Sequence, residues 1–347
     1  MKLSIIIPLY NKEKYIERCL ESLSAQDISP RDYEVIIVDD ESKDSGVEIA
    51  QNYANNNADV NIHLIKQQNQ GPSAARNNGL KLAKGKYVYF LDADDYIALN
   101  TLNYLLKLCE KNNLDILEFD TSEIADGTEP STELSSTPLN SQELAVPVVN
   151  GSTYIIKYNF RNQAWRYIIK RSFILDTEIT FLEEMRAYED LIFTVNLFLQ
   201  SNRISKANIN AHRYVRVPNS IVTTKNSKKN LEFLHSMVKA VSELSILINN
   251  LKTSEQNHLK LIGRLKNKQF VVVYALLVRA FKYGVNTKDL NTILIELNTL
   301  EAYPINPKVE GIGKGSLFHS LFFVPIFNNK TYCLFGLKIM NQLSFFK

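Results

Sequence analysis

The first 120 residues alternate short apolar segments with longer segments of helical periodicity, and this alternation constrains the fold more than any other feature. The apolar segments, which indicate β-strands, lie at residues 4–8, 34–38, 62–66, 86–91 and 115–119. Helical spacing occurs between them at 15–23, 45–55, 72–83 and 100–111, with Asn11 placed as a helix N-cap. Strands that alternate with helices of about ten residues predict an α/β fold with a mostly parallel, Rossmann-like sheet flanked by helices.

The rest of the chain divides into a polar stretch and a helical stretch. Residues 121–150 are rich in Ser, Thr, Glu, Asn and Pro, which predicts a long loop or insertion. Regular structure resumes near Tyr154, residues 189–200 indicate an amphipathic helix, and residues 229–300 are largely helical. A chain of 347 residues is long enough for one large or two modest domains.

Composition argues against several classes of protein. The 40 basic and 37 acidic side chains give a net charge of +3, which is too small to indicate a nucleic-acid partner. The three cysteines show no metal-binding or disulfide spacing, which fits a reducing compartment. The N-terminal apolar run ends at Pro8 and indicates a buried strand rather than an export signal. Since no apolar run reaches the roughly 18 residues of a membrane-spanning helix, we expect a cytoplasmic protein.

The sharpest chemical signal is the run Asp92-Ala93-Asp94-Asp95, directly after an apolar segment. In extended backbone, Asp92 and Asp94 would project to the same side. Two carboxylates about 4 Å apart repel each other by roughly 4 kcal/mol, and a divalent cation removes that repulsion. Mg²⁺ and Mn²⁺ prefer such oxygen ligands and accept phosphate oxygens as further ones. The run therefore predicts a metal site, and the alternative is a solvated acidic turn that caps the following helix.

Polar residues also follow two other predicted strands, at 39–42 and 68–70, and ligands of parallel sheets bind outside the carboxyl ends of the strands. A carboxylate in 39–42 can accept a hydrogen bond from a base N–H or a ribose hydroxyl, although a helix-capping turn is the alternative. The segment from Gly71 to Gly79 has small residues that let a helix approach its neighbours closely. Its Arg76 could reach a phosphate or the acidic run, or be a plain surface arginine.

Two signals lie outside the alternating region. Glu189 and Asp190 open the helix at 189–200, where the helix macrodipole favours acidic residues. The functional alternative is a general base that takes a proton from an acceptor hydroxyl. Arg216 and Ser220 lie on a basic, hydroxyl-rich loop that suits a lid over a diphosphate, although loops of this composition are common.

Taken in order, these motifs resemble the family 2 glycosyltransferases with a GT-A fold. The resemblance covers roughly residues 1–225 and rests on the segments 4–11, 36–42, 71–79, 91–95, 165–171 and 188–190. It implies an inverting transfer of one sugar from a nucleotide-diphosphate donor, usually a UDP-sugar, to an acceptor hydroxyl. It also implies a divalent metal, Mn²⁺ or Mg²⁺, and an acceptor in polysaccharide, capsule or lipid-linked oligosaccharide synthesis.

The resemblance assigns a nucleotide-binding role to nine residues. These residues are Pro8, Tyr10, Asp39, Asp40, Asn69, Arg76, Asp92, Arg216 and Ser220. Pro8 and Tyr10 are expected to flank the base and Asp40 to contact the uracil. Arg216 and Ser220 are expected to close over the diphosphate.

The metal and catalytic roles implied by the resemblance fall on four acidic residues. Asp94 would ligate the metal, and Asp92 would face the ribose and the waters on the metal. Asp190 would be the catalytic base, with Glu189 beside it. One base without a carboxylate nucleophile implies direct displacement with inversion of the sugar's configuration.

Two positions depart from the family pattern. Glu41 stands where the family often has glycine, which affects the geometry of that turn. Some relatives supply a histidine ligand from the loop after the last strand, whereas His212 lies earlier, in a predicted strand, and is expected to be structural.

Two alternative functions stay open. One is a non-catalytic nucleotide-sugar-binding or scaffold protein, against which the intact Asp94 and Asp190 argue. The other is a sugar nucleotidyltransferase, whose glycine-rich N-terminal loop has no counterpart in residues 7–12.

The resemblance also suggests a domain division. Residues 1–225 would form the GT-A catalytic domain, with a nucleotide-binding half at 1–120 and an acceptor-side half at 121–225. Residues 226–347 would form a helical C-terminal region with an apolar and basic tail. That tail, residues 316–347, contains three lysines and no acidic residue. Its short apolar pieces predict peripheral contact with the cytoplasmic face of a membrane, and the alternative is packing against the catalytic domain.

Overall fold

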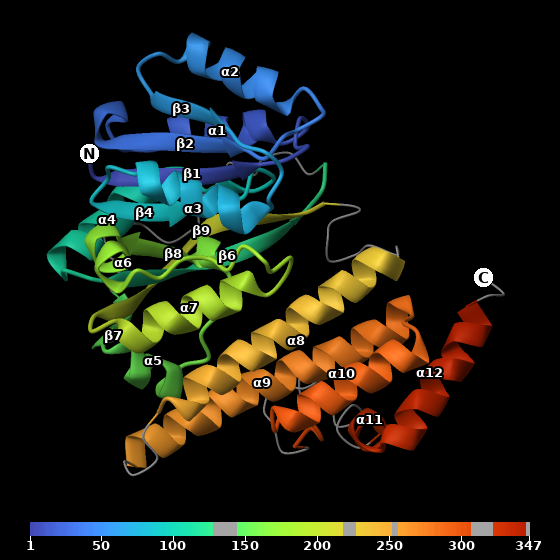
Figure 1. Cartoon of the computed structure of the whole chain (residues 1–347). Helices are drawn as coiled ribbons and strands as arrows, with labels where there is room; N and C mark the ends of the chain where they lie inside the picture. The colour runs from blue at the N-terminus through green and yellow to red at the C-terminus, as the bar shows by residue number, and fades with distance from the viewer. Residues whose placement is uncertain (128–143, 218–226, 252–255, 307–321, 345–347) are drawn as a thin grey trace. The chain divides into compact units, whose positions relative to one another are not determined.

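The structure of the chain is a computed structural model that describes residues 1–127, 144–217, 227–251, 256–306 and 322–344. The chain divides into two compact units. The first unit comprises Met1–Glu184 and Phe193–Pro218, and the second comprises Met185–Ile192 and Asn219–Lys347. The described part of the first unit is a sheet with helices, whereas that of the second is helical (Figure 1).

The first unit is built on one sheet with the strand order β3-β2-β1-β4-β8-β6-β9-β5, and β7 pairs with β9. The strands are β1 (Leu3–Leu9), β2 (Tyr33–Asp39), β3 (Asn61–Lys66), β4 (Tyr87–Phe90), β5 (Tyr96–Ile97), β6 (Ile116–Ala125), β7 (Leu144–Val149), β8 (Tyr167–Lys170) and β9 (Ile204–Arg216). β1 is parallel to β2 and β4, and β2 is parallel to β3. β8 is antiparallel to β4 and β6, so the sheet is mixed beyond β4. The predicted α/β fold is confirmed. Parallel pairing joins the first four strands and also β6 with β9.

The helices of this part of the chain are α1 (Ile16–Ser24), α2 (Gly46–Asn56), α3 (Pro72–Leu82), α4 (Leu102–Lys111), α5 (Gly151–Lys157), α6 (Arg171–Thr177) and α7 (Glu189–Gln200). Five of them follow the predicted segments closely, whereas α5 and α6 lie where no helix is predicted. The prediction that Asn11 caps the first helix is wrong, because the N-cap position of α1 is Tyr15. Asn11 has a positive φ of 51°, and its Oδ1 accepts a hydrogen bond from the Lys43 N–H at 2.7 Å.

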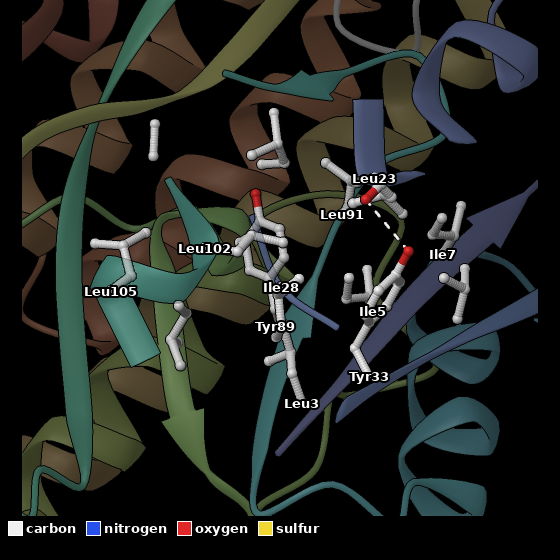
Figure 2. Packing of buried hydrophobic residues seen from close by; sticks show 14 of the residues in the cluster. Leu3, Ile5, Ile7, Leu23, Ile28, Tyr33, Tyr89, Leu91, Leu102 and Leu105 are labelled. Atoms are coloured by element: carbon white, nitrogen blue, oxygen red, sulfur yellow. Dashed lines mark hydrogen bonds between the residues drawn. The ribbon is translucent and has the colours of Figure 1, made fainter. Parts of the chain in front are cut away.

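The core of the first unit forms around β1, whose apolar residues are fully buried on both faces as expected of a central parallel strand. Figure 2 shows Leu3, Ile5 and Ile7 of β1 among the side chains of neighbouring elements. The hydroxyl of Tyr33 donates a hydrogen bond to the carbonyl oxygen of Leu23 at 3.3 Å, which joins β2 to α1. This packing holds β1 in place, and the candidate site lies at the end of β1 and of its neighbouring strands.

The prediction of one long loop at 121–150 is wrong at both ends. β6 continues to Ala125 and β7 begins at Leu144, whereas residues 128–143 lie outside the described part. The outer half of β6 pairs in parallel with β9, from Thr121 opposite His212 to Ala125 opposite Arg216. Polar side chains suit this half because they are partly or fully exposed there, so composition alone concealed the strand.

A glycine sets how closely α3 lies on the sheet. A Cβ atom at Gly79 would stand 2.4 Å from Cγ2 of Ile6 on β1 and 3.4 Å from Cγ2 of Val38 on β2. Only a residue without a side chain allows this approach. The close packing of small residues expected for Gly71 to Gly79 is therefore present at Gly79.

The second unit consists of α8 (Ser227–Asn249), α9 (Gln256–Tyr283), α10 (Thr287–Thr299), α11 (Val324–Asn328) and α12 (Lys330–Ser344), preceded in the chain by residues 185–192. Its interior holds polar links. In one of them, Nε2 of Gln269 donates to the Val241 carbonyl at 3.0 Å and to Oγ of Ser245 at 2.6 Å. Among the helices that the structure describes, none combines the length and the hydropathy needed to cross a bilayer.

We expect Gly79→Ala to lower the free energy of unfolding by about 1–3 kcal/mol, because the added methyl group would displace buried Ile6. Gly263→Ala in α9 is the matched control, since a Cβ there meets nothing within 4 Å. That control should raise stability by up to about 1 kcal/mol, because alanine is the better helix former. Urea unfolding of both variants measures the difference, and equal effects would show that α3 is not packed as described.

Candidate functional site

Three parallel strands deliver the candidate site residues to one edge of the sheet. Leu9 at the end of β1 lies opposite Asp39 at the end of β2, and the Asp40 N–H donates to the Leu9 carbonyl at 2.8 Å. β4 lies on the other side of β1 and runs directly into Asp92. The polar residues that follow the three strands therefore come together, as the sequence predicts for a parallel sheet.

Asp40 is buried and orders the segment that follows β3. Its Oδ1 accepts hydrogen bonds from Nε2 of Gln67 and the Gln70 N–H, each at 2.8 Å. Its Oδ2 accepts from the Gly71 N–H at 2.9 Å, and its carbonyl accepts from Nδ2 of Asn69 at 2.9 Å. The carboxylate thus holds the backbone that leads into α3, and the Asp40 carbonyl holds Asn69 beside the end of β2. Its predicted contact with uracil stays a prediction.

The turn after β2 contains a conformation that favours glycine. Glu41 has a φ of 67°, in the left-handed region that costs a residue with a side chain about 1–2 kcal/mol. Two contacts hold it there: Nζ of Lys43 donates to its Oε1 at 3.1 Å, and the Asn69 N–H donates to its Oε2 at 3.4 Å. A glutamate therefore adopts here the backbone conformation that suits the glycine expected from the resemblance.

Arg76 joins α3 to the acidic run. Its guanidinium is buried and donates to Oδ1 of Asp92 at 2.8 Å. The same guanidinium lies 5.2 Å from the ring centroid of Phe181. Arg76 is therefore not a plain surface arginine, and its charge is held against a carboxylate of the site.

Asp94 has a different cationic partner, Lys12 from the end of β1. Nζ of Lys12 donates to Oδ2 of Asp94, and the guanidinium of Arg18 donates to the Asp94 carbonyl at 3.1 Å. Burial raises the pKa of the Asp94 carboxyl above its ordinary value, and the charge of Lys12 opposes that rise. The Asp94 and Lys12 side chains are 20% and 26% exposed, so this ion pair is accessible to a ligand.

Asp95 is turned away from solvent and joins β4 to β9. Its Oδ2 lies 3.0 Å from Nε2 of His212, and its Oδ1 accepts from the Val215 N–H at 2.8 Å. The hydroxyl of Tyr89 lies 2.9 Å from Nδ1 of His212, and the Trp165 ring stacks on the imidazole at 4.2 Å. A neutral His212 with its proton on Nε2 satisfies both hydrogen bonds, and burial holds its pKa well below the ordinary value. His212 has the buried surroundings of a structural residue.

The backbone of the acidic run differs from the extended form assumed for it. The Asp95 N–H donates to the Asp92 carbonyl at 3.0 Å, which closes a turn. The alternative in which this turn caps the following helix also fails, because that helix begins at Leu102, after β5. In the turn, Asp92 and Asp94 stay partly exposed while Asp95 is buried.

The donor set at the end of β4 fits a divalent metal. Asp92 and Asp94 offer carboxylate oxygens, the ligand type that Mg²⁺ and Mn²⁺ prefer. Each carboxylate already attracts a cationic side chain, with the Lys12 ammonium standing where a positive ion would bind Asp94. Among the described residues, no group of three or more His, Cys, Asp or Glu side chains could enclose a metal. Phosphate oxygens and waters would have to complete the coordination.

The remaining predicted residues lie in several places. Pro8 is in β1 and Tyr10, 46% exposed, follows it at the same edge. Arg216 ends β9, where its exposed guanidinium pairs with Glu123 of β6. Ser220 lies outside the described residues.

Glu189 and Asp190 form the first turn of α7, in the part of that helix that belongs to the second unit. The residue before them, Tyr188, has a positive φ of 64°. Its ring packs edge to face against Phe233 of α8, with centroids 6.2 Å apart. The start of α7 is therefore held in a backbone conformation that a tyrosine rarely adopts.

Sequence reasoning missed three residues at this site: Lys12, Arg18 and Gln67. Lys12 carried a usable signal, because a cation directly after the first strand must lie at the edge where the acidic run also ends. Arg18 gave no comparable signal, since a charged residue in a surface helix is ordinary.

Comparison with known proteins is consistent with this geometry. The sequence model of one family, described as glycosyl transferase family 2, matches residues 4–177. The chain is 34% identical over 223 residues to the uncharacterized glycosyltransferase EpsJ of Bacillus subtilis, covering 63% of the chain and 62% of EpsJ. It is 32% identical over 214 residues to the poly(ribitol-phosphate) beta-N-acetylglucosaminyltransferase TarS of Staphylococcus aureus, covering 62% of the chain and 35% of TarS. The matches therefore span less than two thirds of either relative.

Solved structures agree on the fold. Residues 1–349 of S. aureus TarS in complex with UDP superpose with a TM-score of 0.66 at 24% identity, covering 99% of the chain and 92% of that structure. The mannosyltransferase PcManGT of Pyrobaculum calidifontis, in complex with GDP-Man and Mn²⁺, superposes with a TM-score of 0.52 at 15% identity, covering 98% and 87%. At these identities the likeness concerns the GT-A fold. Together with the family match, it shows that the chain is a member of glycosyl transferase family 2.

Proposed function

We propose that the chain is an inverting, metal-dependent glycosyltransferase that moves one sugar from a UDP-sugar to an acceptor hydroxyl. The observation that carries the proposal is the different surroundings of three neighbouring carboxylates. Asp95 is buried in a structural network, whereas Asp92 and Asp94 stay accessible and each attracts a cation. Such a site suits a metal and a diphosphate. TarS, whose structures were solved with UDP and with UDP-GlcNAc, supports UDP as the nucleotide.

The nucleotide would lie along the ends of β1 and β2. Tyr10 and Pro8 would flank the base, and Asp39 with the segment held by Asp40 would contact the base and the ribose. Asn69 is exposed and fixed by its bond to the Asp40 carbonyl, so its position is set before a ligand arrives. Arg216 and Ser220 would close over the diphosphate. Preorganised polar groups of this kind reduce the entropy lost on binding.

A divalent metal would be held by Asp94 and Asp92. The structure of PcManGT, which has the same fold and was solved with Mn²⁺, supports this proposal. Its chemistry would be to stabilise the charge of the departing diphosphate. In the same region, Arg76 would keep Asp92 in place through their 2.8 Å bond. Lys12 would leave Asp94 when the metal binds and would then be free to contact the diphosphate.

Asp190 would take the proton from the attacking acceptor hydroxyl. Its place in the first turn of α7 stabilises a carboxylate through the N–H groups of the helix start. The positive φ of Tyr188 and its packing against Phe233 fix where that turn begins. Strained backbone that the surroundings hold in place is common at catalytic sites. Glu189 would lie beside the base.

The acceptor would be a polysaccharide or a lipid-linked saccharide. The proposal is supported by TarS, whose name gives poly(ribitol-phosphate) as its acceptor. The alternative of a scaffold that binds the nucleotide-sugar without reaction predicts UDP binding but no turnover. Assays with a panel of nucleotide-sugars, Mn²⁺ and a saccharide acceptor separate the two. Only an enzyme releases UDP in proportion to the amount of acceptor that is glycosylated.

We expect Asp94→Asn to lower the metal-dependent transfer rate by about 100-fold or more, because it removes a charged ligand worth several kcal/mol. Asp59→Asn, an exposed change in the same unit, is the control and should keep the wild-type rate. UDP release with Mn²⁺ and with excess chelator is the measurement. Full activity of Asp94→Asn, or of the wild type in chelator, contradicts the metal role.

We expect Lys12→Gln to bind Mn²⁺ at least about tenfold more tightly than the wild type when no nucleotide is present. The reason is that the metal no longer competes with a bound ammonium for Asp94. Electron paramagnetic resonance of free Mn²⁺ measures this affinity without any turnover. Lys14→Gln, two residues away and exposed, is the matched control and should bind like the wild type. Weaker Mn²⁺ binding by Lys12→Gln would mean that Lys12 supports the site instead of competing with the metal.

We expect Asp190→Asn to lower kcat by about 10²–10⁴-fold, the usual contribution of a general base, with UDP affinity close to the wild type. Asp289→Asn is the control, because Asp289 is also an acidic residue in a first helical turn, that of α10. Steady-state rates and calorimetric titration with UDP give the two quantities. Loss of UDP binding in a folded Asp190→Asn variant would assign Asp190 to the nucleotide and not to the acceptor.

A further inference from the structure

The last described helix, α12, is apolar on two opposite faces. Its inner face carries Cys333 and Leu337, which are fully buried, and it packs on the helices α9, α10 and α11 of the second unit. A helix on the surface of a protein normally presents polar residues on its other face. α12 departs from this pattern.

The outer face of α12 carries a row of large apolar side chains. Tyr332 is 62% exposed, Phe335 is 63% exposed and Ile339 is 40% exposed. Residues spaced by three, four and seven lie on one side of a helix, so these three form a continuous row. In α11, Ile326 is also 42% exposed. We call the four residues the outer apolar row. Exposed aromatic residues gathered in this way mark an interaction surface.

The C-terminal segment that carries the outer apolar row has charged side chains of one sign. From residue 311 to the C-terminus the sequence contains four lysines and no acidic residue, although acidic residues make up 37 of the chain's 347. Two of these lysines, Lys330 and Lys338, are exposed on α12. Lys338 is three residues from Phe335 and therefore lies next to the row. An anionic lipid surface attracts lysines and repels carboxylates, which matches the charge of this segment.

We propose that the outer apolar row and its lysines dock the second unit on an anionic membrane surface, in the manner of an interfacial helix. The 15 residues of α12 span about 22 Å, enough to lie in the plane of the interface and too short to cross it. Aromatic side chains are favoured at the boundary between headgroups and acyl chains. The anionic leaflet of a cell membrane is the cytoplasmic one, so the docking face would hold the protein there. The proposal does not rest on the transfer reaction, because it uses no residue of the candidate site.

Co-sedimentation of the full chain with lipid vesicles tests the proposal. The wild type should sediment with vesicles of phosphatidylcholine and phosphatidylglycerol, and much less with phosphatidylcholine alone. Tyr332→Ser with Phe335→Ser should lower the partition constant at least about tenfold, because two aromatic side chains no longer insert. The matched control is Ile246→Ser with Leu259→Ser, since both residues are exposed apolar side chains of the same unit outside the row. The control should partition like the wild type.

A second pair of variants tests the charge. Lys330→Glu with Lys338→Glu should also lower partitioning onto the anionic vesicles at least about tenfold. The reason is that each lysine near an anionic surface contributes attraction, which a glutamate turns into repulsion. Lys107→Glu with Lys260→Glu makes the same change of net charge at exposed sites in α4 and near the start of α9, and should have a small effect. Thermal unfolding of every variant shows whether the fold is kept.

Two results would overturn the proposal. The first is equal partitioning of the wild type and the Tyr332→Ser, Phe335→Ser variant. The second is sedimentation equilibrium in which the wild type self-associates and the variant does not, while neither binds vesicles. In that case a second copy of the chain covers the outer apolar row. Neither result depends on UDP binding, so each leaves the proposed function to its own tests.

Discussion

Three carboxylates within four residues at the end of β4 repel one another, and the surrounding structure depends on the partner that each one has. Asp95 is buried, where an unpaired polar group is most costly, and it accepts hydrogen bonds from a neutral His212 and from the Val215 N–H. Asp92 pairs with Arg76 from α3. Asp94 pairs with Lys12, which follows β1, and this pair is the most accessible of the three. These partners tie the acidic run to α3, to β9 and to the segment that follows β1.

The same edge of the sheet concentrates backbone that residues with side chains rarely adopt. Asn11 and Glu41 both have positive φ, and Gly71 has a φ of 93° where its N–H meets Asp40. Each of these turns is closed by hydrogen bonds between segments about 30 residues apart in sequence. A conformation that costs about 1 kcal/mol or more persists only when several contacts determine it together. The rigidity of the loops that would receive a nucleotide thus comes from cross-links between them and not from any one loop.

The second unit differs in how its polarity is arranged. Its long helices bury apolar residues and the hydrogen bonds of Gln269 in the interior of the unit. α12 also exposes apolar side chains to solvent. In the candidate site each of the three carboxylates has a partner within the chain, but an outward apolar row can be covered only by something outside the chain. The basic charge of the segment that carries the row favours lipid as the partner.

Sequence alone determined the alternation of strands and helices, the edge where polar residues gather, the family, and the structural character of His212. These features follow from local periodicity and from the order of motifs along the chain, which can be read without knowing any tertiary contact. It could not decide whether Asp92–Asp95 is extended or a turn, and it did not predict that Asn11 binds Lys43 instead of capping a helix, or that residues 121–125 continue a strand. Only the tertiary structure decided these features, because each depends on a hydrogen bond or strand pairing between residues that the local pattern does not connect. The pairing of Lys12 with Asp94, 82 residues away in sequence, is of the same kind: proximity in the folded sheet, not spacing in the chain, brings the two charges together.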